Sequence, residues 1–415
     1  MQETHAALGE AQEATNNKPN TFRRTIWQRP NIHTEEDERL HRKVSWLELF
    51  YDLVFVAVIA QLSHYLAAHM TWDGLAGYAL LFVPVWWVWI ASTYYNERFE
   101  TFGLETRVFT FLQMLPVAAM AVFAYYALGA MGAQFALAYA TARIIHIFLW
   151  ARAGYYVPVA RPMTNRYAIA FSISVVLFII SAFVQPPLRY VLWIIGLTID
   201  IAAPVLTLRF QRELPRLSTT KLPERFGLLV ILVLGETVVG AVNGMAGNHN
   251  LTWAVGFVAV LGMALAFALW WVYFDFVARR PARPSVWWTL FWGYGHLPLV
   301  MGLVAVGAGV LVLVSDLNAT NGAKQLIAVA MGLTLTVTGL LEVTLRREPN
   351  EPTHAWISPL MKIVVGGVAA TLALFSSALT VPGLLLILLA LVATQIAYGV
   401  WVWFTQDIPV DDSIS

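Results

Sequence analysis

The sequence predicts an all-α, polytopic membrane protein of about twelve transmembrane helices, arranged as two parallel six-helix repeats. Of its 415 residues, 59% are hydrophobic and only 12% are charged, with a mean hydropathy of +0.65. A soluble domain carries about 25% charged residues. The chain also holds many apolar segments of spanning length, and short motifs of its first half recur in its second half.

The expected spans follow one another with short polar connections. They cover residues 45–68, 74–96, 106–129, 133–155, 166–184, 188–209, 224–245, 251–277, 286–314, 323–345, 357–379 and 382–404. Residues 1–44 are polar and charged, which is typical of a partly disordered tail. Because the tail begins without an apolar stretch, we expect no cleaved signal peptide. Residues 405–415 form a second short tail.

Basic residues predict the orientation. With the N-terminus in the cytoplasm, nearly all lysines and arginines fall in the tails, inner loops and inner helix ends. Only Arg189 and Lys324 fall outside, and Arg143 lies within a span. This bias is the positive-inside pattern. Since the number of spans is even, both termini are expected in the cytoplasm.

Short matches between the halves predict an internal duplication. The motif LELFYDLV begins the first span and PERFGLLV begins the seventh, so that Glu48 aligns with Glu224. Trp89 aligns with Trp271 at a slightly larger offset, as expected where a loop is longer in the second half. We therefore expect one repeat at 45–209 and another at 224–404, joined by a basic cytoplasmic linker at 210–223. An even number of helices per repeat makes the two repeats parallel.

Polar side chains within the spans are the candidate functional residues, because a charge in hydrocarbon costs about 2.5–3.5 kcal/mol on insertion scales. The candidate pore or substrate site comprises Glu48, Asp52, Arg143, His146, Asp200, Glu236, His296 and Gln395. The deeper members favour a permeation, substrate or proton-relay site near the middle of the membrane.

Structural explanations exist for the same residues. Glu48 and Asp52 lie one helical turn apart at the start of the first span, where acids complement the helix dipole and pair with arginines. Alternatively, they line the mouth of a pore. Arg143 could pair with Asp200 or with Glu236 and hold helices together.

Three motifs resemble the bacterial low temperature requirement protein A family, LtrA. They are SWLELFYDLVFVAVIAQLSH, ERFGLLVILVLGETVVG and YGHLPLV, and the resemblance covers about residues 22–404. It implies a multi-spanning protein of the bacterial inner membrane, linked by name to growth in the cold, with no established substrate. The motif residues that carry over are Glu48, Asp52, Glu224, Glu236 and His296.

A second resemblance concerns the first span. LFYDLVFVAVIAQL is similar to the first helix of lysosomal-type potassium and proton channels, which carry a Phe-Ser-Asp motif. Phe50-Tyr51-Asp52 takes the place of that motif, with tyrosine for serine as a departure. Ile59 takes the place of an apolar constriction.

The leading hypothesis is a transporter or channel for a cation, a proton or a small solute. One alternative is a non-transporting sensor or assembly protein for cold or stress adaptation. Another is an intramembrane enzyme in which His146, His296, Glu236 and Asp200 converge on a metal or a lipid headgroup. No His-Glu-x-x-His motif or phosphate-binding loop supports that alternative, and the chain has no cysteine. We therefore expect no enzyme, no cofactor or metal and no nucleic-acid partner, but contact with the lipid bilayer.

Overall fold

The computed structural model describes residues 27–33, 44–99, 101, 103–248, 251–278, 280–347, 351 and 353–405. Within these ranges, 12 helices are long and apolar enough to cross a membrane. The described residues form no strand, only an isolated bridge between Ala282 and Leu345. The predicted all-α polytopic fold is confirmed. Most of the two predicted tails lies outside the described residues.

The helices form two groups along the chain. The first group contains α3 (Trp46–Ala68), α4 (Trp72–Phe99), α5 (Leu104–Ala124), α6 (Gly132–Tyr156), α7 (Arg161–Ala182) and α8 (Leu188–Leu206). After the short α9 (Leu208–Gln211), the second group contains α10 (Lys221–Ala246), α11 (Trp253–Tyr273), α12 (Val286–Ser315), α13 (Asn321–Thr344), α14 (Ile357–Thr371) and α15 (Val381–Thr405). A π-helical turn at Phe274–Ala278 continues α11, and a 3-10 segment at Leu372–Ala378 continues α14.

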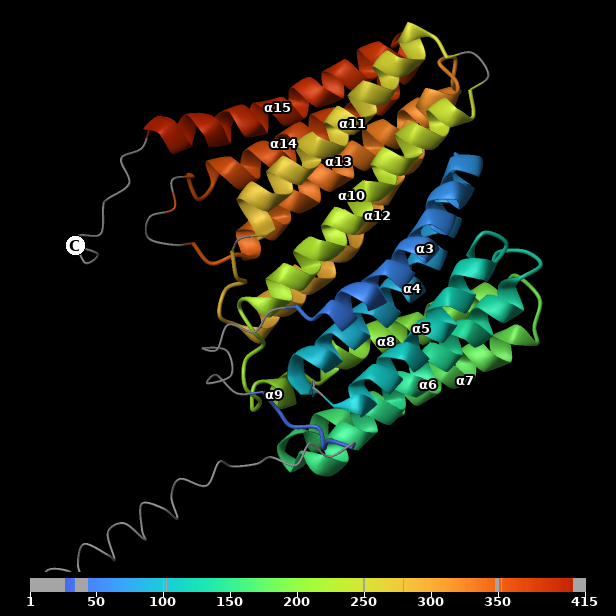
Figure 1. Ribbon diagram of the computed structural model, residues 1–415, viewed down its shortest axis with the longest axis vertical. Coiled ribbons are helices and arrows are strands. Elements are labelled where there is room, and N and C mark those ends of the chain that lie inside the picture. The colour runs from blue at the N-terminus through green and yellow to red at the C-terminus, as the bar shows by residue number, and fades with distance from the viewer. Residues whose placement is uncertain are drawn as a thin grey trace, which may run out of the picture.

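Figure 1 shows the first group below and the second group above, with α3 at the edge of the first group that faces the second. The groups meet where α3 and α4 pack against α10 and α12. Helices at the same place in the order of each group pack in the same way. In the first group α3 packs against α5 and α6 against α7, and in the second group α10 packs against α12 and α13 against α14. The duplication itself stays a prediction.

The bundle has two sides. The tail side is the end at which α3 and α10 begin, and the far side is the end at which α3 gives way to α4. Consecutive spans cross in opposite directions, so α4 and α8 end on the tail side, whereas α13 begins on the far side. The tail side is the one predicted to face the cytoplasm.

Local sequence explains where α3 begins. The Ser45 hydroxyl accepts a hydrogen bond from the Glu48 N–H, and the Glu48 carboxylate accepts one from the Ser45 N–H at 2.9 Å. This capping box satisfies two backbone donors at the helix start. The helix α10 begins at Lys221, earlier than the predicted 224, so Lys221 belongs to a span and not to the linker.

Candidate functional site

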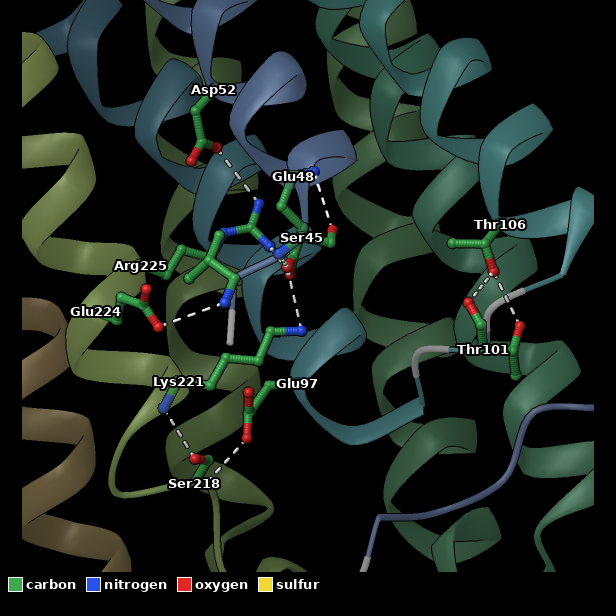
Figure 2. A network of polar contacts seen from close by, with 11 residues as sticks. Ser45, Glu48, Asp52, Glu97, Thr101, Thr106, Ser218, Lys221, Glu224 and Arg225 are labelled. Carbon is green, nitrogen blue, oxygen red and sulfur yellow. Dashed lines mark hydrogen bonds and ion pairs between the residues drawn. The ribbon is translucent and has the colours of Figure 1, made fainter. Parts of the chain in front are cut away.

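Charged side chains from α3 and α10 meet between the two helix groups on the tail side. Glu48 forms ion pairs with Arg225 at 2.5 Å and with Lys221 at 3.1 Å. Asp52 pairs with Arg225 at 3.4 Å. Figure 2 shows the four side chains converging, and all are buried. We call these four residues the tail-side lock.

The spacing of the residues explains why the two helices match. Glu48 and Asp52 are four residues apart on α3, and Lys221 and Arg225 are four apart on α10, so each pair lies on one helix face. Two acids therefore oppose two bases across the contact, and the lock carries no net formal charge. The Trp89 indole of α4 donates to Asp52 at 2.8 Å and adds a third helix to the cluster.

The lock extends into the segment that precedes α10. The Glu97 carboxylate, near the end of α4, accepts a hydrogen bond from the Ser218 N–H at 2.9 Å. The Ser218 hydroxyl in turn accepts one from the Lys221 N–H at 3.0 Å. Breaking one partner of a buried charge pair leaves an uncompensated charge. The network therefore holds the two groups together on the tail side.

Arg143 and Asp200 form a separate cluster inside the first group. Arg143 pairs with Asp200 at 3.0 Å, and both side chains are fully buried. The Tyr139 and Ser174 hydroxyls donate to the other Asp200 oxygen at 2.5 and 3.0 Å. The Arg143 guanidinium lies over the Phe171 ring. Of the two partners the sequence left open, Asp200 is the one that Arg143 contacts, and the cluster joins α6, α7 and α8.

The two predicted histidines occupy different places. His296 of α12 contacts the Tyr273 hydroxyl through Nε2 at 3.0 Å, and its ring packs against Phe226. Phe226 also packs against Trp89, so His296 borders the tail-side lock through aromatic contacts. His146 contacts the backbone oxygen of Ala142 in its own helix, and its Nε2 has no partner within the described part of the chain.

Glu236 and Gln395 do not join these clusters. Glu236 interacts across the α3–α10 contact with Ser63 and His64. Gln395 is buried in α15, where its amide contacts Thr394. The predicted site residues thus lie at several separate places, with Glu48 and Asp52 in one cluster and Arg143 and Asp200 in another.

One buried network of charged residues was not predicted from the sequence. On the tail side of the second group, Lys362 pairs with Glu342 at 3.0 Å, and Arg280 pairs with Glu342 at 3.5 Å and with Glu351 at 3.2 Å. The Ser358 hydroxyl also donates to Glu342. Lys362 and Glu342 both lie within predicted spans, so the criterion that selected the other candidates, a polar side chain within a span, applies to them as well.

The acidic and histidine side chains that the structure describes do not gather as a metal site would require. Among the residues that the structure describes, no three His, Asp or Glu side chains are placed to hold one ion. His146, His296, Glu236 and Asp200 therefore do not form a three-residue metal site with one another, and the lipid-headgroup form of the enzyme alternative stays untested.

A cavity of about 360 Å³ separates the two groups on the far side. Leu66, Met70, Trp72 and Tyr78 line it from the first group, and Met301 and Ala330 are among its residues from the second. It includes Met70 and Thr71 of the turn between α3 and α4, so it extends to the far-side end of the bundle. Its walls are mostly apolar.

These features define a multi-pass α-helical membrane protein with buried charge clusters and a one-sided cavity between two helix groups. Residues 43–402 match the family of the Bacterial low temperature requirement A protein (LtrA), and the chain belongs to this family. The resemblance to LtrA is thus confirmed, while the likeness to lysosomal-type channels stays a prediction.

The chain is also similar to a curated protein. It is 31% identical over 291 residues to "Uncharacterized protein RA0937" of Rhizobium meliloti (strain 1021), covering 64% of this chain and 68% of that protein. No solved structure matches the chain significantly.

Proposed function

We propose that the protein is a transporter of the bacterial inner membrane that moves a cation, a proton or a small solute by alternating access. In this proposal the tail side faces the cytoplasm, and the two helix groups move relative to each other. The protein carries out no chemical reaction on its substrate.

The observation that supports the proposal is the asymmetry between the two sides. The same two groups are joined by the buried tail-side lock and separated by a 360 Å³ cavity that reaches the far side. Alternating access needs such an arrangement, with the pathway open to one side and closed to the other. The structure then corresponds to an outward-open state.

The lock is suited to act as a closure that can open. Its ion pairs are direct contacts between α3 and α10, and together they carry no net charge. When the two helices separate, water can enter and solvate the freed charges. The aromatic rings of Trp89, Phe226 and Trp292 pack next to it and exclude water in the closed state.

Flux in proteoliposomes tests transport directly. Purified protein is reconstituted under K⁺, Na⁺ and H⁺ gradients, and also without a gradient, beside Asp52→Asn and Glu236→Gln. We expect selective flux in the wild type and reduced flux in at least one variant. No flux from folded wild-type protein under any gradient would contradict cation or proton transport, and would leave organic solutes or a sensor role.

Cysteine labelling tests the two-sided arrangement independently of the substrate. The chain has no cysteine, so an introduced Ala305→Cys in the far-side cavity is a single label site. A membrane-impermeant maleimide should label it from outside in intact cells. Ala305 and Ala140 are 4% and 2% exposed, but of the two only Ala305 lines the cavity, so Ala140→Cys in α6 is the matched control and should stay unlabelled. Equal labelling of the two would contradict the outward-open assignment.

The lock itself is tested with Arg225→Gln in the Ala305→Cys background. Loss of the guanidinium removes two ion pairs and should raise the share of tail-side-open molecules, which slows labelling from outside. Unchanged labelling rates at equal protein levels would show that the lock does not control access.

A further inference from the structure

The far-side cavity is elongated and follows one face of α13. Its residues from α13 recur at intervals of three or four, which places them on one face of that helix. They are Gly322, Gln325, Leu326, Val329, Ala330 and Leu333. Gly322 and Leu333 are 11 residues apart, or about 16 Å at about 1.5 Å per residue. Because α13 begins on the far side, the cavity runs from that end toward the middle of the bundle.

The helices around the cavity leave one of its sides uncovered. Met301, Gly302 and Ala305 of α12 form its floor. The floor helix packs against α3 and α4 and also against α13, whereas α13 has no comparable packing against α3 or α4. Leu333 and Leu374 line the α13 side and are 40% and 79% exposed. The side opposite the floor is therefore rimmed by apolar side chains and faces the surrounding membrane.

The lining suits hydrocarbon and not an ion. Among the described residues that line the cavity there is no Asp, Glu, Lys, Arg or His. The Tyr78 hydroxyl donates to the Met301 carbonyl at 2.9 Å, and the Thr71 hydroxyl accepts a hydrogen bond from the Gly74 N–H at 3.1 Å. A charge would lose its hydration in such surroundings, and apolar cavities hold no stable water. These walls therefore favour an apolar occupant.

The polar part of the lining lies at the far-side end. Thr71 and Trp72 lie where α3 gives way to α4, and Gln325 lies near the start of α13. Trp72 is 78% exposed, in the position typical of tryptophans at the level of lipid headgroups. The cavity is thus polar at its far-side end and apolar along its depth, in the same order as a lipid of the far-side leaflet.

We propose that the far-side cavity binds one acyl chain of a phospholipid from the far-side leaflet, with the headgroup beside Trp72 and Gln325. An acyl chain crosses one leaflet, about 15 Å or half of a hydrocarbon core about 30 Å thick. This length matches that of the cavity along α13. The chain enters through the side opposite the floor. The site stands whether or not the protein transports, because it follows from the shape and lining of the cavity.

A bound chain has a consequence for access to the cavity. It lies between the two helix groups on the far side, so it stabilises the state in which they are apart there. It also occupies the space through which a water-soluble label reaches Ala305→Cys. Lipid exchange with the bilayer leaves the cavity empty part of the time, and labelling proceeds from that empty state.

Photocrosslinking in a bilayer tests the site. The full-length protein is reconstituted in vesicles of phosphatidylethanolamine and phosphatidylglycerol. A trace of the phosphatidylethanolamine carries a diazirine near the methyl end of one acyl chain, and adducts are located by mass spectrometry. We expect adducts at Ala305 on the floor and none at Ala140, which is as buried but lies outside the cavity. No adducts at either residue would overturn the proposal.

A second lipid tests the alignment of the chain. With the diazirine next to the acyl carbonyl, adducts should move from Ala305 to the far-side end of the cavity, at Thr71, Trp72 and Gln325. The same adduct positions with both lipids would contradict a chain that lies along α13.

Two variants assign the adducts to the cavity. Val329→Phe enlarges a partly exposed residue of the lining and should remove most adducts at Ala305. Val238→Phe makes the same change at a 41% exposed position of α10 outside this cavity and should label as the wild type does. Adducts at Leu386, 46% exposed on α15, serve as the internal standard. Unchanged labelling of Ala305 in Val329→Phe would refute the assignment.

Flux measured on the same vesicles separates this inference from the proposed function. Adducts at Ala305 without flux of any solute would refute transport and leave the lipid site. Flux without adducts at Ala305 would refute the lipid site and leave transport.

Discussion

Replacing Asp200 by asparagine separates a structural role from a transport role for the Arg143–Asp200 cluster. The aspartate accepts hydrogen bonds from Arg143, Tyr139 and Ser174, at 3.0, 2.5 and 3.0 Å. Both charged side chains are fully buried. Asn in place of Asp200 keeps the size of the side chain but removes the countercharge of a guanidinium that no solvent reaches.

The magnitude follows from that burial. Removing one partner of a buried ion pair is expected to lower the free energy of unfolding by about 3–5 kcal/mol. The double variant Arg143→Met with Asp200→Leu removes both charges together, and such replacements are often neutral. It still leaves the Tyr139 and Ser174 hydroxyls without an acceptor, at roughly 1 kcal/mol each. We therefore expect the double variant to be more stable than the single variant Asp200→Asn.

Unfolding in detergent measures the stabilities, with Thr198→Val on an exposed position of α8 as the control. Flux per folded molecule is measured on the same samples. If the cluster is structural, the double variant keeps wild-type flux. Asp200→Asn with stability within about 1 kcal/mol of the wild type would refute the structural reasoning, and a stable double variant without flux would place Arg143, Asp200 or both in the transport path.

Three further changes test the packing. Gly293→Ala should lower stability by about 1–3 kcal/mol through overpacking against Tyr94, and melting of the variant should recover when Tyr94→Phe is added. Glu342→Gln removes a carboxylate that pairs with two buried cations, so a loss of about 3–5 kcal/mol is expected, and a loss below about 1 kcal/mol would contradict the network. Trp89→Phe removes a donor to a buried carboxylate at 2.8 Å, and should destabilise the protein by about 1.5–3 kcal/mol, whereas an unchanged melting curve would show that this bond contributes nothing.

The twelve spans were predictable because membrane insertion depends on local composition and length. Span boundaries from hydropathy lie close to the helix ends, as at Trp46–Ala68 and Val286–Ser315. The start of α10 was missed because Lys221 is charged, and hydropathy alone assigns a charged residue to a loop. In the structure its ammonium pairs with Glu48, which makes its place at a helix start favourable.

The partners of the polar residues were less predictable. Residue spacing shows that Glu48 and Asp52 share a helix face, but not which helix lies opposite. The choice of Asp200 over Glu236 by Arg143 depends on packing: α6 and α8 both pack against α7, whereas Glu236 lies on α10, which packs against α3. The sequence did contain a pattern that could have predicted the tail-side lock. Two acids on one helix and two bases on another have the same spacing, so the two pairs are complementary.

The tail-side lock and the aromatic contacts near it constrain how the helix groups can move. Trp87 of α4 packs edge to face against Tyr294 of α12 at 5.6 Å between ring centroids, so separating the groups on the tail side breaks this contact. A ligand favours the state that it binds more tightly, by the difference in binding free energy between the two states. The ion pairs of the tail-side lock and the contact between Trp87 and Tyr294 both stabilise the closed state. A substrate that opens the tail side has to bind the open state better by more than their combined contribution.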